Sequence, residues 1–119
     1  MRDLVKAMKA LSDETRLRIL NLLLERECCV CEVMQAMDIS QTRASRNLSV
    51  LYDAGYLNKR KEGLWTLYSI NLEYVEEYLP DIIEAVKKAL KDNGVTALDL
   101  ERLGKAERVG PSCVSKSRR

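Results

Sequence analysis

Apolar side chains recur at helical spacing in the first third of the chain and predict three short helices. The first is amphipathic, with Leu4, Met8 and Leu11 on one side. The second is expected from Asp13 to about Arg26, because the Asp13 carboxylate can accept hydrogen bonds from the unpaired N–H groups of a first helical turn. A third helix follows, with apolar residues at positions 33, 34 and 37.

The fourth predicted helix follows a polar turn and has two contrasting faces. Residues 38–40 are typical of a turn in which Ser40 caps the helix that starts at Gln41. Gly55 suits the end of this helix, since glycine readily adopts the left-handed conformation found just after helices. The apolar face carries Ala44, Leu48, Leu51 and Tyr52. The opposite, polar face carries Gln41, Thr42, Ser45, Arg46 and Ser49.

The second half of the chain predicts a β-hairpin and two further helices. β-prone runs at residues 56–60 and 65–70 flank a connector that contains Gly63, which favours a hairpin. Pro80 is expected at the first position of the next helix, and Asn93-Gly94 just after its end. Residues 95–108 predict one weak helix, and the polar, basic residues from Gly110 onward are expected to be mobile.

The order of helix, tight turn, helix and hairpin between Cys31 and Ile70 is that of a winged helix-turn-helix, a mainly α fold with a small β-hairpin. In this fold the polar face of the second helix enters the major groove of DNA, where Gln41 and Arg46 could read base edges. Basic hairpin residues, expected near its tip, could hold phosphates or an adjacent minor groove. The candidate DNA-binding residues are Ser40, Gln41, Thr42, Arg43, Ser45, Arg46, Lys59, Arg60 and Lys61.

The distribution of charge favours DNA binding more than the total does. The whole chain has 20 basic and 18 acidic residues, a net charge of +2. Residues 40–61 hold five basic residues against one acidic residue, or +4, whereas residues 71–93 hold three lysines against six acidic residues, or −3. Basic charge is therefore concentrated where the motif would meet DNA. A winged helix used only for protein contacts is an alternative, which a steep salt dependence of DNA binding would exclude.

Composition argues against several other classes of protein. The chain has no histidine, which removes imidazole metal ligands and the Ser–His and Cys–His catalytic pairs. No nucleophile–base pair or phosphate-binding loop stands out, so we do not expect an enzyme. There is neither a stretch of the ~20 apolar residues that a membrane span needs nor a secretion signal, so we expect a cytoplasmic protein without membrane contact.

Three of the four cysteines are crowded at Cys28, Cys29 and Cys31. In a reducing compartment, clustered thiols more often serve metal binding or redox chemistry than structural disulfides. Thiolates suit soft ions such as As(III), Sb(III), Cd(II), Pb(II) and Zn(II), although a closed structural zinc site would need four ligands. A position at the start of the third helix is expected to lower the pKa of these thiols.

The geometry of a regular helix constrains how these cysteines combine. Cys28 and Cys31 would share a face, while Cys29 and Cys31 would point apart, so an ion held by Cys29 and Cys31 would require a distorted helix start. This conflict suggests a switch between ligand binding and the DNA-binding conformation. The alternative is a thiol redox sensor or oxidoreductase that uses Cys28 and Cys31 as a disulfide pair.

Taken together, these motifs resemble the ArsR/SmtB repressors. The resemblance extends from Leu4 to Leu90 and rests on residues 13–20, 29–32, 40–41, 45–48, 55–57 and 60–68. It implies a homodimeric winged-helix repressor that binds operator DNA without a cofactor and releases it when an inducer binds. It also implies that the dimer forms through the first and last helices, about residues 4–11 and 80–93. We accordingly expect a DNA-binding and dimerisation domain at residues 1–94 and a C-terminal extension at 95–119.

Cys29-Val30-Cys31 is similar to the inducer site of the arsenic-responsive branch, in which three thiolates hold As(III) or Sb(III). Met34 stands where that branch usually has its third cysteine, and Cys28 stands where an apolar residue is usual. Cys28 or Cys113 is then the candidate third ligand. Coordination is expected to distort the start of the third helix and to tilt the paired recognition helices away from their DNA half-sites.

Overall fold

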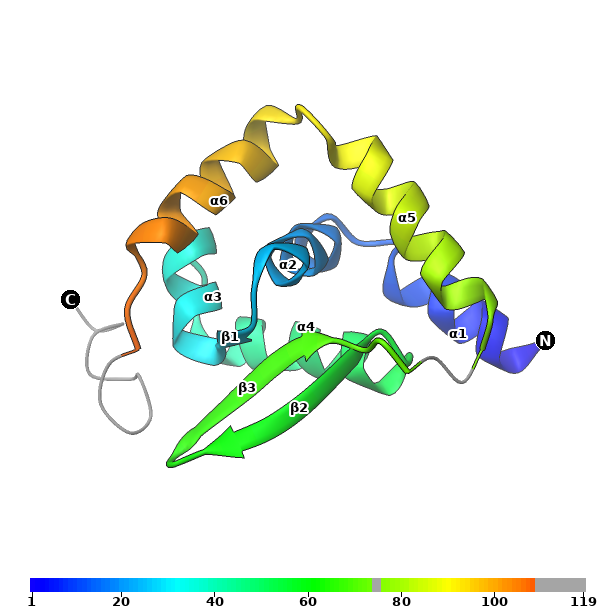
Figure 1. Ribbon diagram of the computed structural model, residues 1–119, viewed down its shortest axis with the longest axis horizontal. Coiled ribbons are helices and arrows are strands. Elements are labelled where there is room, and N and C mark those ends of the chain that lie inside the picture. Colours follow the sequence, from blue (N-terminus) through cyan, green and yellow to red (C-terminus); the bar gives the residue numbers. More distant parts are fainter. Residues whose placement is uncertain (74–75, 109–119) are drawn as a thin grey trace.

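The computed structural model describes residues 1–73 and 76–108, which form six helices and a small antiparallel sheet whose hairpin lies at the lower edge of the view (Figure 1). The helices are α1 (Arg2–Ala10), α2 (Glu14–Glu25), α3 (Val30–Met37), α4 (Gln41–Asp53), α5 (Tyr78–Leu90) and α6 (Gly94–Lys105). The strands are β1 (Cys28–Cys29), β2 (Leu57–Glu62) and β3 (Trp65–Ile70). The predicted winged helix-turn-helix, formed here by α3, α4 and the β2–β3 hairpin, is confirmed.

Side-chain caps fix the starts of α2 and α4 as the sequence predicts. Asp13 accepts a hydrogen bond from the backbone N–H of Arg16 at 3.0 Å, and Ser40 accepts one from the N–H of Arg43 at 3.1 Å. Asp38, with φ of 54°, makes the left-handed turn between α3 and α4. Gly55 has φ of 97° after α4, where a side chain would be strained.

The core forms where α2 meets α4, α5, α6 and the sheet (Figure 1). Fully buried apolar residues from α2, α3 and α4 include Ile19, Leu20, Leu22, Val33, Leu48 and Leu51. Tyr56, also fully buried, donates a hydrogen bond from its hydroxyl to the carbonyl of Ala7 at 2.9 Å and so joins α1 to this core. The burial of one face of α4 leaves its polar face outward.

The sheet contains one strand that the sequence pattern did not predict. Its order is β1-β3-β2, with β3 paired to both neighbours in antiparallel register. The predicted hairpin is present, and its turn lies at Gly63 and Leu64. β1 has only two residues, Cys28 and Cys29, which pair with Tyr68 and Leu67. So short a strand is specified by its distant partner and has no periodic signal of its own.

The C-terminal helices differ from expectation at their starts. α5 begins at Tyr78, so Pro80 is its third residue and not its first. Proline is tolerated there because the N–H groups of a first turn have no helical acceptor. α5 ends at Leu90. Asn93 then caps the next helix, accepting hydrogen bonds from the N–H groups of Val95 and Thr96 at 2.9 and 3.1 Å.

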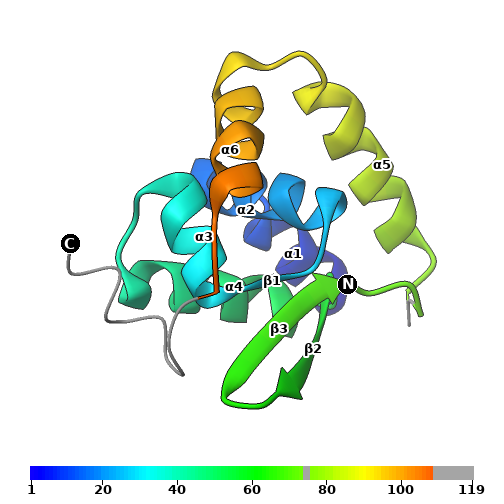
Figure 2. The ribbon, with the colours of Figure 1, turned by 60° about the vertical axis from the view of Figure 1, so that its left-hand side comes forward.

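The helix expected to be weak, α6, is firmly docked on α2 and α3. Arg18 donates two hydrogen bonds to the buried Asp99 carboxylate, at 2.9 and 2.8 Å, and Arg26 donates one to the carbonyl of Leu103 at 3.1 Å. Figure 2 shows the chain leaving α6 and descending beside α3 toward β1. The division at residue 94 stays a prediction, and the residues from Gly110 lie outside the described residues.

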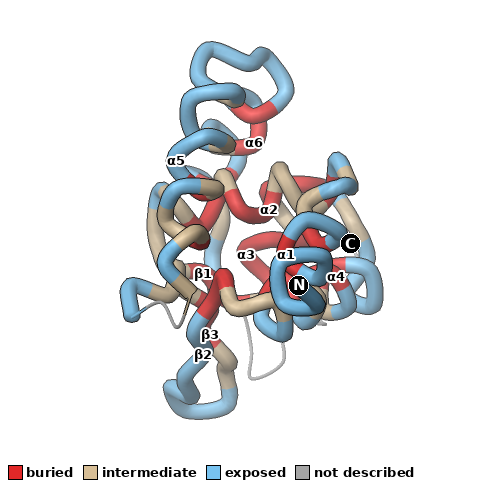
Figure 3. Tube along the Cα trace, turned by 90° about the vertical axis from the view of Figure 1, so that its right-hand side faces the viewer, coloured by how far each residue is buried: buried red, intermediate tan, exposed pale blue. Residues whose placement is uncertain are grey.

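Large apolar side chains remain exposed on α1. Leu4 is 37% exposed and Met8 is 55% exposed, so the apolar side predicted for this helix is not covered within one chain. Figure 3 shows most of α1 as exposed. Within the described residues, no helix is both long and apolar enough to cross a membrane.

Candidate DNA-binding surface and cysteine cluster

The outer face of α4 presents most of the predicted recognition residues. Ala44, Leu48 and Leu51 are fully buried, which fixes the rotation of the helix about its axis. The exposed residues of the candidate set on or beside α4 are Ser40, Gln41, Thr42, Arg43 and Arg46, whereas Ser45 is half-buried. A helix with one buried and one polar face, preceded by a tight turn, has the shape that fits a major groove.

Two members of this set also have structural partners. The Ser40 hydroxyl caps α4, and the Arg43 guanidinium donates a hydrogen bond to the Thr15 hydroxyl at 2.9 Å. Asn47, which sequence reasoning missed, is buried and accepts a hydrogen bond from Arg16 at 3.1 Å. These bonds hold the recognition helix against the start of α2. A polar residue on an otherwise apolar helix face is the signal that could have identified Asn47.

The three basic hairpin residues do not lie together on one face of the hairpin. Side chains alternate along a strand, so Lys59 and Lys61 lie on one face of the sheet and Arg60 on the other. Lys59 Nζ lies 4.2 Å from the centre of the Tyr52 ring on α4. Arg60 donates two hydrogen bonds to Glu27, at 3.0 and 2.7 Å, which tie β2 to the chain just before β1.

Cys29 and Cys31 converge without any distortion of α3, contrary to the expectation from a regular helix. The helix begins at Val30, and Cys29 precedes it in an extended conformation. The Sγ atoms of Cys29 and Cys31 lie 2.8 Å apart, and each residue is only 1% exposed. They form a buried cluster with Leu67 of β3, against which Trp65 packs.

Cys28 belongs to a different environment, because neighbouring residues in a strand point to opposite faces of the sheet. It lies in the main core, where its thiol donates a hydrogen bond to the carbonyl of Arg26 at 3.4 Å. The expectation that Cys28 and Cys31 share a helix face is therefore wrong, since Cys28 is not in the helix. Cys28 and Cys29 are not disulfide-bonded in this structure, whereas Cys31 is.

The expected lowering of the thiol pKa values is also wrong. Burial raises the pKa of Cys28 to about 12 and raises the pKa of Cys29 above its ordinary value, and the nearby Glu32 carboxylate acts in the same direction. The partial positive charge at the start of a short helix does not offset the loss of solvation. The Cys28 and Cys29 thiols are accordingly neutral near pH 7.

Glu32 is the acidic residue that organises this cluster, although only 4% of it is exposed. Its carboxylate accepts hydrogen bonds from the Cys29 N–H at 2.9 Å, from Arg26 at 2.7 Å and from Arg108 at 3.1 Å. Although burial opposes ionisation, these hydrogen bonds hold the pKa of Glu32 below its ordinary value. The signal in the sequence is a glutamate three residues after the helix cap, as in a capping box.

The segment after α6, residues 107 and 108, covers the cysteine cluster. Sequence reasoning did not predict this cover. Gln35 and Glu107 exchange two hydrogen bonds between the Gln35 amide and the Glu107 backbone, at 2.6 and 3.1 Å. Arg108 contacts Glu62 of β2 at 3.7 Å as well as Glu32. The cluster is thereby enclosed by α3, β3 and residues 107–108.

The cluster as described contains two closely spaced sulfur atoms and one unsatisfied donor. Among residues 1–73 and 76–108, no group of three or more Cys, Asp, Glu or His side chains is arranged to hold a metal ion. Cys113 lies outside the described residues. The indole N–H of Trp65 is buried and has no hydrogen-bond partner in the described part of the chain, which is a costly arrangement unless a ligand supplies an acceptor.

Comparison with known proteins places this arrangement among bacterial regulators. Residues 13–59 match the family model described as bacterial regulatory protein, arsR family. The chain is 34% identical over 109 residues to the arsenic resistance transcriptional regulator ArsR1 of Pseudomonas putida, covering 88% of this chain and 83% of that protein. It is 44% identical over 68 residues to the arsenical resistance operon repressor of Escherichia coli, covering 56% and 58% of the two chains.

A solved structure supports the same fold. The homodimeric winged helix-turn-helix DNA-binding domain Mb0332 of Mycobacterium bovis, described as a possible ArsR-family transcriptional regulator, matches with a TM-score of 0.63 and 28% sequence identity. The match covers 78% of this chain and 82% of that one. The fold and the sequence relatives therefore agree.

Proposed function

The chain belongs to the arsR family of bacterial regulatory proteins and is a DNA-binding transcriptional repressor, and we propose that As(III) or Sb(III) bound by Cys29 and Cys31 releases it from its operator. Its relatives and its fold are those of transcriptional regulators, which are not enzymes. The observation that carries the proposal is the 2.8 Å approach of the Cys29 and Cys31 sulfur atoms beside β3, a strand of the β2–β3 hairpin that forms the wing of this fold.

Trivalent arsenic suits this cluster because it is soft and forms stable bonds to thiolates. Arsenous acid, As(OH)₃, loses one hydroxyl as water for each thiol that it binds, and the thiol supplies the proton. The reaction needs Cys31 in its reduced form. With two sulfur ligands the arsenic keeps one hydroxyl, whose oxygen can accept a hydrogen bond from the unpartnered indole N–H of Trp65. A third thiol from Cys113 would replace that hydroxyl.

Cys28 is the weaker candidate for the third thiol. Its side chain lies on the opposite face of β1 from Cys29, in the main core. Bringing it to the arsenic would require β1 to rotate and would leave a cavity among core residues, which costs on the order of 1 kcal/mol or more. Cys29 and Cys31 are accordingly the essential pair.

The repressor is proposed to bind a two-fold operator as a homodimer. The recognition helix α4 places Gln41, Thr42, Ser45 and Arg46 at the major groove, while Lys59 and Lys61 hold phosphates. Ser40 and Arg43 orient the helix, and Arg60 anchors the wing through Glu27. Dimerisation through α1 and α5 would cover the exposed Leu4 and Met8.

Ligand binding is coupled to DNA through the small sheet. Cys29 pairs with Leu67 of β3, and Leu67 pairs in turn with Arg60 of β2. Any movement of β1 that accompanies arsenic binding therefore shifts the wing directly, and distortion of α3 is not required. A 100-fold loss of operator affinity would need a coupling of about 3 kcal/mol, at the upper end of typical allosteric values.

The test is operator release titrated with As(III), Sb(III), Cd(II) and Zn(II) under reducing conditions. Cys29→Ser and Cys31→Ser are expected to bind operator like the wild type and to lose release by As(III), whereas Cys28→Ser keeps it. The fluorescence of Trp65, the single tryptophan of the chain, reports binding independently of DNA. Release by arsenite in the Cys29→Ser and Cys31→Ser variants would overturn the site assignment.

The redox alternative predicts a different outcome in the same experiment. If a disulfide controlled DNA binding, an oxidant would release the operator without arsenite, and two thiols per chain would disappear from a titration under denaturing conditions. Arsenite binding protects thiols only while the protein is folded. Full recovery of thiols after denaturation and removal of arsenic supports metalloid sensing.

A further inference from the structure

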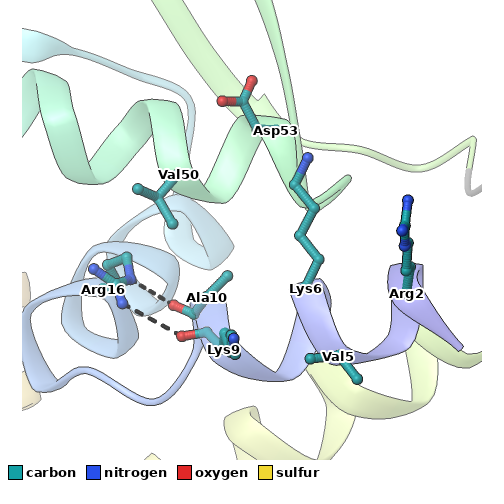
Figure 4. A pocket seen from close by; sticks show the side chains of 8 residues that line it. All are labelled: Arg2, Val5, Lys6, Lys9, Ala10, Arg16, Val50 and Asp53. Atoms are coloured by element: carbon teal, nitrogen blue, oxygen red, sulfur yellow. Dashed lines mark hydrogen bonds between the residues drawn. The ribbon is translucent and has the colours of Figure 1, made fainter.

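An open pocket of about 540 Å³ lies between α1, the start of α2 and the second half of α4 (Figure 4). None of the residues that line it belongs to the candidate DNA-binding residues. Its lining is rich in basic residues and has a single carboxylate. The lining residues are Arg2, Val5, Lys6, Lys9, Ala10, Arg16, Val50 and Asp53.

The basic residues of the pocket come mainly from one face of α1. Arg2, Lys6 and Lys9 are spaced by four and three positions, so they lie on the same side of the helix. Ala7 and Ala10 point into the core, and the exposed Leu4 and Met8 lie on yet another side. α1 thus has a buried face, an apolar exposed face and a basic exposed face. With Arg16 and Asp53 the pocket carries four positive charges and one negative charge, or +3.

Arg16 holds this basic face against the recognition helix. Its guanidinium donates hydrogen bonds to the carbonyls of Ala10 at 2.7 Å and Lys9 at 3.3 Å, at the end of α1. The same group donates to Asn47 of α4 at 3.1 Å. One planar side chain therefore fixes α1 relative to α4, and Figure 4 shows Arg16 bonded to both α1 carbonyls.

The pocket opens beside the exposed face of α4. Val50 and Asp53 of that helix line it, and Arg46 lies one helical turn before Val50. In Figure 4 the side chains of Arg2 and Lys6 extend in the same direction, toward the side on which Asp53 lies. The face of the recognition helix that carries Arg46 therefore continues through Val50 and Asp53 to the pocket edge, opposite the basic face of α1.

We propose that this pocket binds phosphates of the duplex DNA backbone beside the groove that α4 enters. The proposal rests on the DNA binding proposed above and extends its contact surface to α1. Lysine ammonium groups on flexible stems suit phosphate contacts, which position a protein on DNA without reading its sequence. A free phosphate ion has the same chemistry, but continuity with the recognition helix favours the DNA backbone.

The test is the salt dependence of DNA affinity for the double variant Lys6→Gln/Lys9→Gln. Affinities are measured for an operator selected from a random library by the wild type and for a random duplex, across a range of salt concentrations. Each lost phosphate contact lowers the slope of log affinity against log salt by about 0.9 and costs about 5-fold in affinity near 0.15 M salt. Equal losses on both duplexes are expected, because phosphates carry no sequence information.

The double variant Lys91→Gln/Lys105→Gln is the matched control, since it removes the same charge from exposed positions outside the pocket. It is expected to keep the wild-type slope. Asp53→Asn removes the one carboxylate and is expected to tighten binding. Equal thermal unfolding midpoints establish that the variants remain folded.

Each outcome bears on a specific claim. A wild type that binds neither duplex would overturn the proposed function itself. A wild type that binds, with a Lys6→Gln/Lys9→Gln slope equal to that of the wild type or the control, would overturn the phosphate pocket alone. Stoichiometric binding of inorganic phosphate to the pocket, with the slope unchanged, would assign it to a free anion instead.

Discussion

At the scale of single residues, the protonation state of the thiols determines how the proposed binding of As(III) depends on pH. Burial keeps Cys29 protonated near pH 7, because it raises the pKa of that thiol. Arsenous acid is neutral in the same range, and it releases one water for each thiol bound. Proton uptake and release therefore cancel for arsenic. A divalent ion such as Cd(II) brings no hydroxide and must expel the thiol protons into solution.

We therefore predict that the As(III) affinity of the reduced protein is nearly constant between pH 6 and pH 8. The Cd(II) affinity is expected to rise by about 10-fold per pH unit for each neutral thiol that it deprotonates. Trp65 fluorescence titrations at several pH values measure both, and Cys28→Ser serves as the control. A steep pH dependence for As(III) would mean that Cys29 and Cys31 are already thiolates before binding.

At the scale of secondary structure, α6 matters because it leads the chain back over the cysteine cluster. Its contact with α2 depends on the pair between Arg18 and the buried Asp99. Removing one partner of such a pair leaves the other with a charge that has lost its counterion. If that loss loosens α6, residues 107 and 108, which follow it and cover Cys31, are no longer held in place.

Asp99→Asn is predicted to lower the free energy of unfolding by about 2 kcal/mol, less than for a fully buried pair because Arg18 remains partly exposed. It is also expected to speed alkylation of Cys29, since the cover over the cluster loosens. Glu101→Gln, which removes the exposed pair with Lys105 at 3.8 Å, is the control and is expected to change neither quantity. Denaturant unfolding and mass-spectrometric alkylation rates measure the two effects. Unchanged alkylation in a destabilised Asp99→Asn variant would show that α6 does not hold the cover.

The elements that sequence could predict are those specified locally. Asp13 and Ser40 mark helix starts because the N–H groups that donate to their side chains lie only three residues later, and the hairpin is marked by its own glycine turn. The pair between Arg18 and Asp99 spans 81 positions, and that between Glu27 and Arg60 spans 33. Nothing in a local pattern specifies such contacts. The start of α3 at Val30 depends on β1 pairing with β3, which is why the orientation of the cysteines was predicted wrongly.

At the scale of the whole molecule, charge and apolar surface divide the protein into regions. The recognition helix, the wing and the basic face of α1 carry positive charge, while residues 71–93 carry −3. The apolar side of α1 remains uncovered. A dimer that buries this side would hold two recognition helices at a fixed spacing. Binding of one half-site would then make binding of the second half-site intramolecular.

Met8→Lys is predicted to convert the dimer to a monomer, because it places a charge at the centre of the exposed apolar side of α1. Operator affinity should fall by about 100-fold or more, since the second half-site contact is no longer intramolecular. Light scattering after size-exclusion chromatography measures the mass. Leu64→Lys, at the exposed hairpin turn, is the control and should remain dimeric. A dimeric Met8→Lys protein would place the interface elsewhere.

The alternation of side chains in β1 has an evolutionary consequence. Cys28 contributes to the main core, while Cys29 and Cys31 lie in a separate cluster on the far side of the sheet. The side chains of that cluster are separate from the core in which α2, α3 and α4 pack. Inducer specificity can therefore diverge among descendants of such a repressor by changes at a few positions, while the DNA-binding scaffold is inherited unchanged.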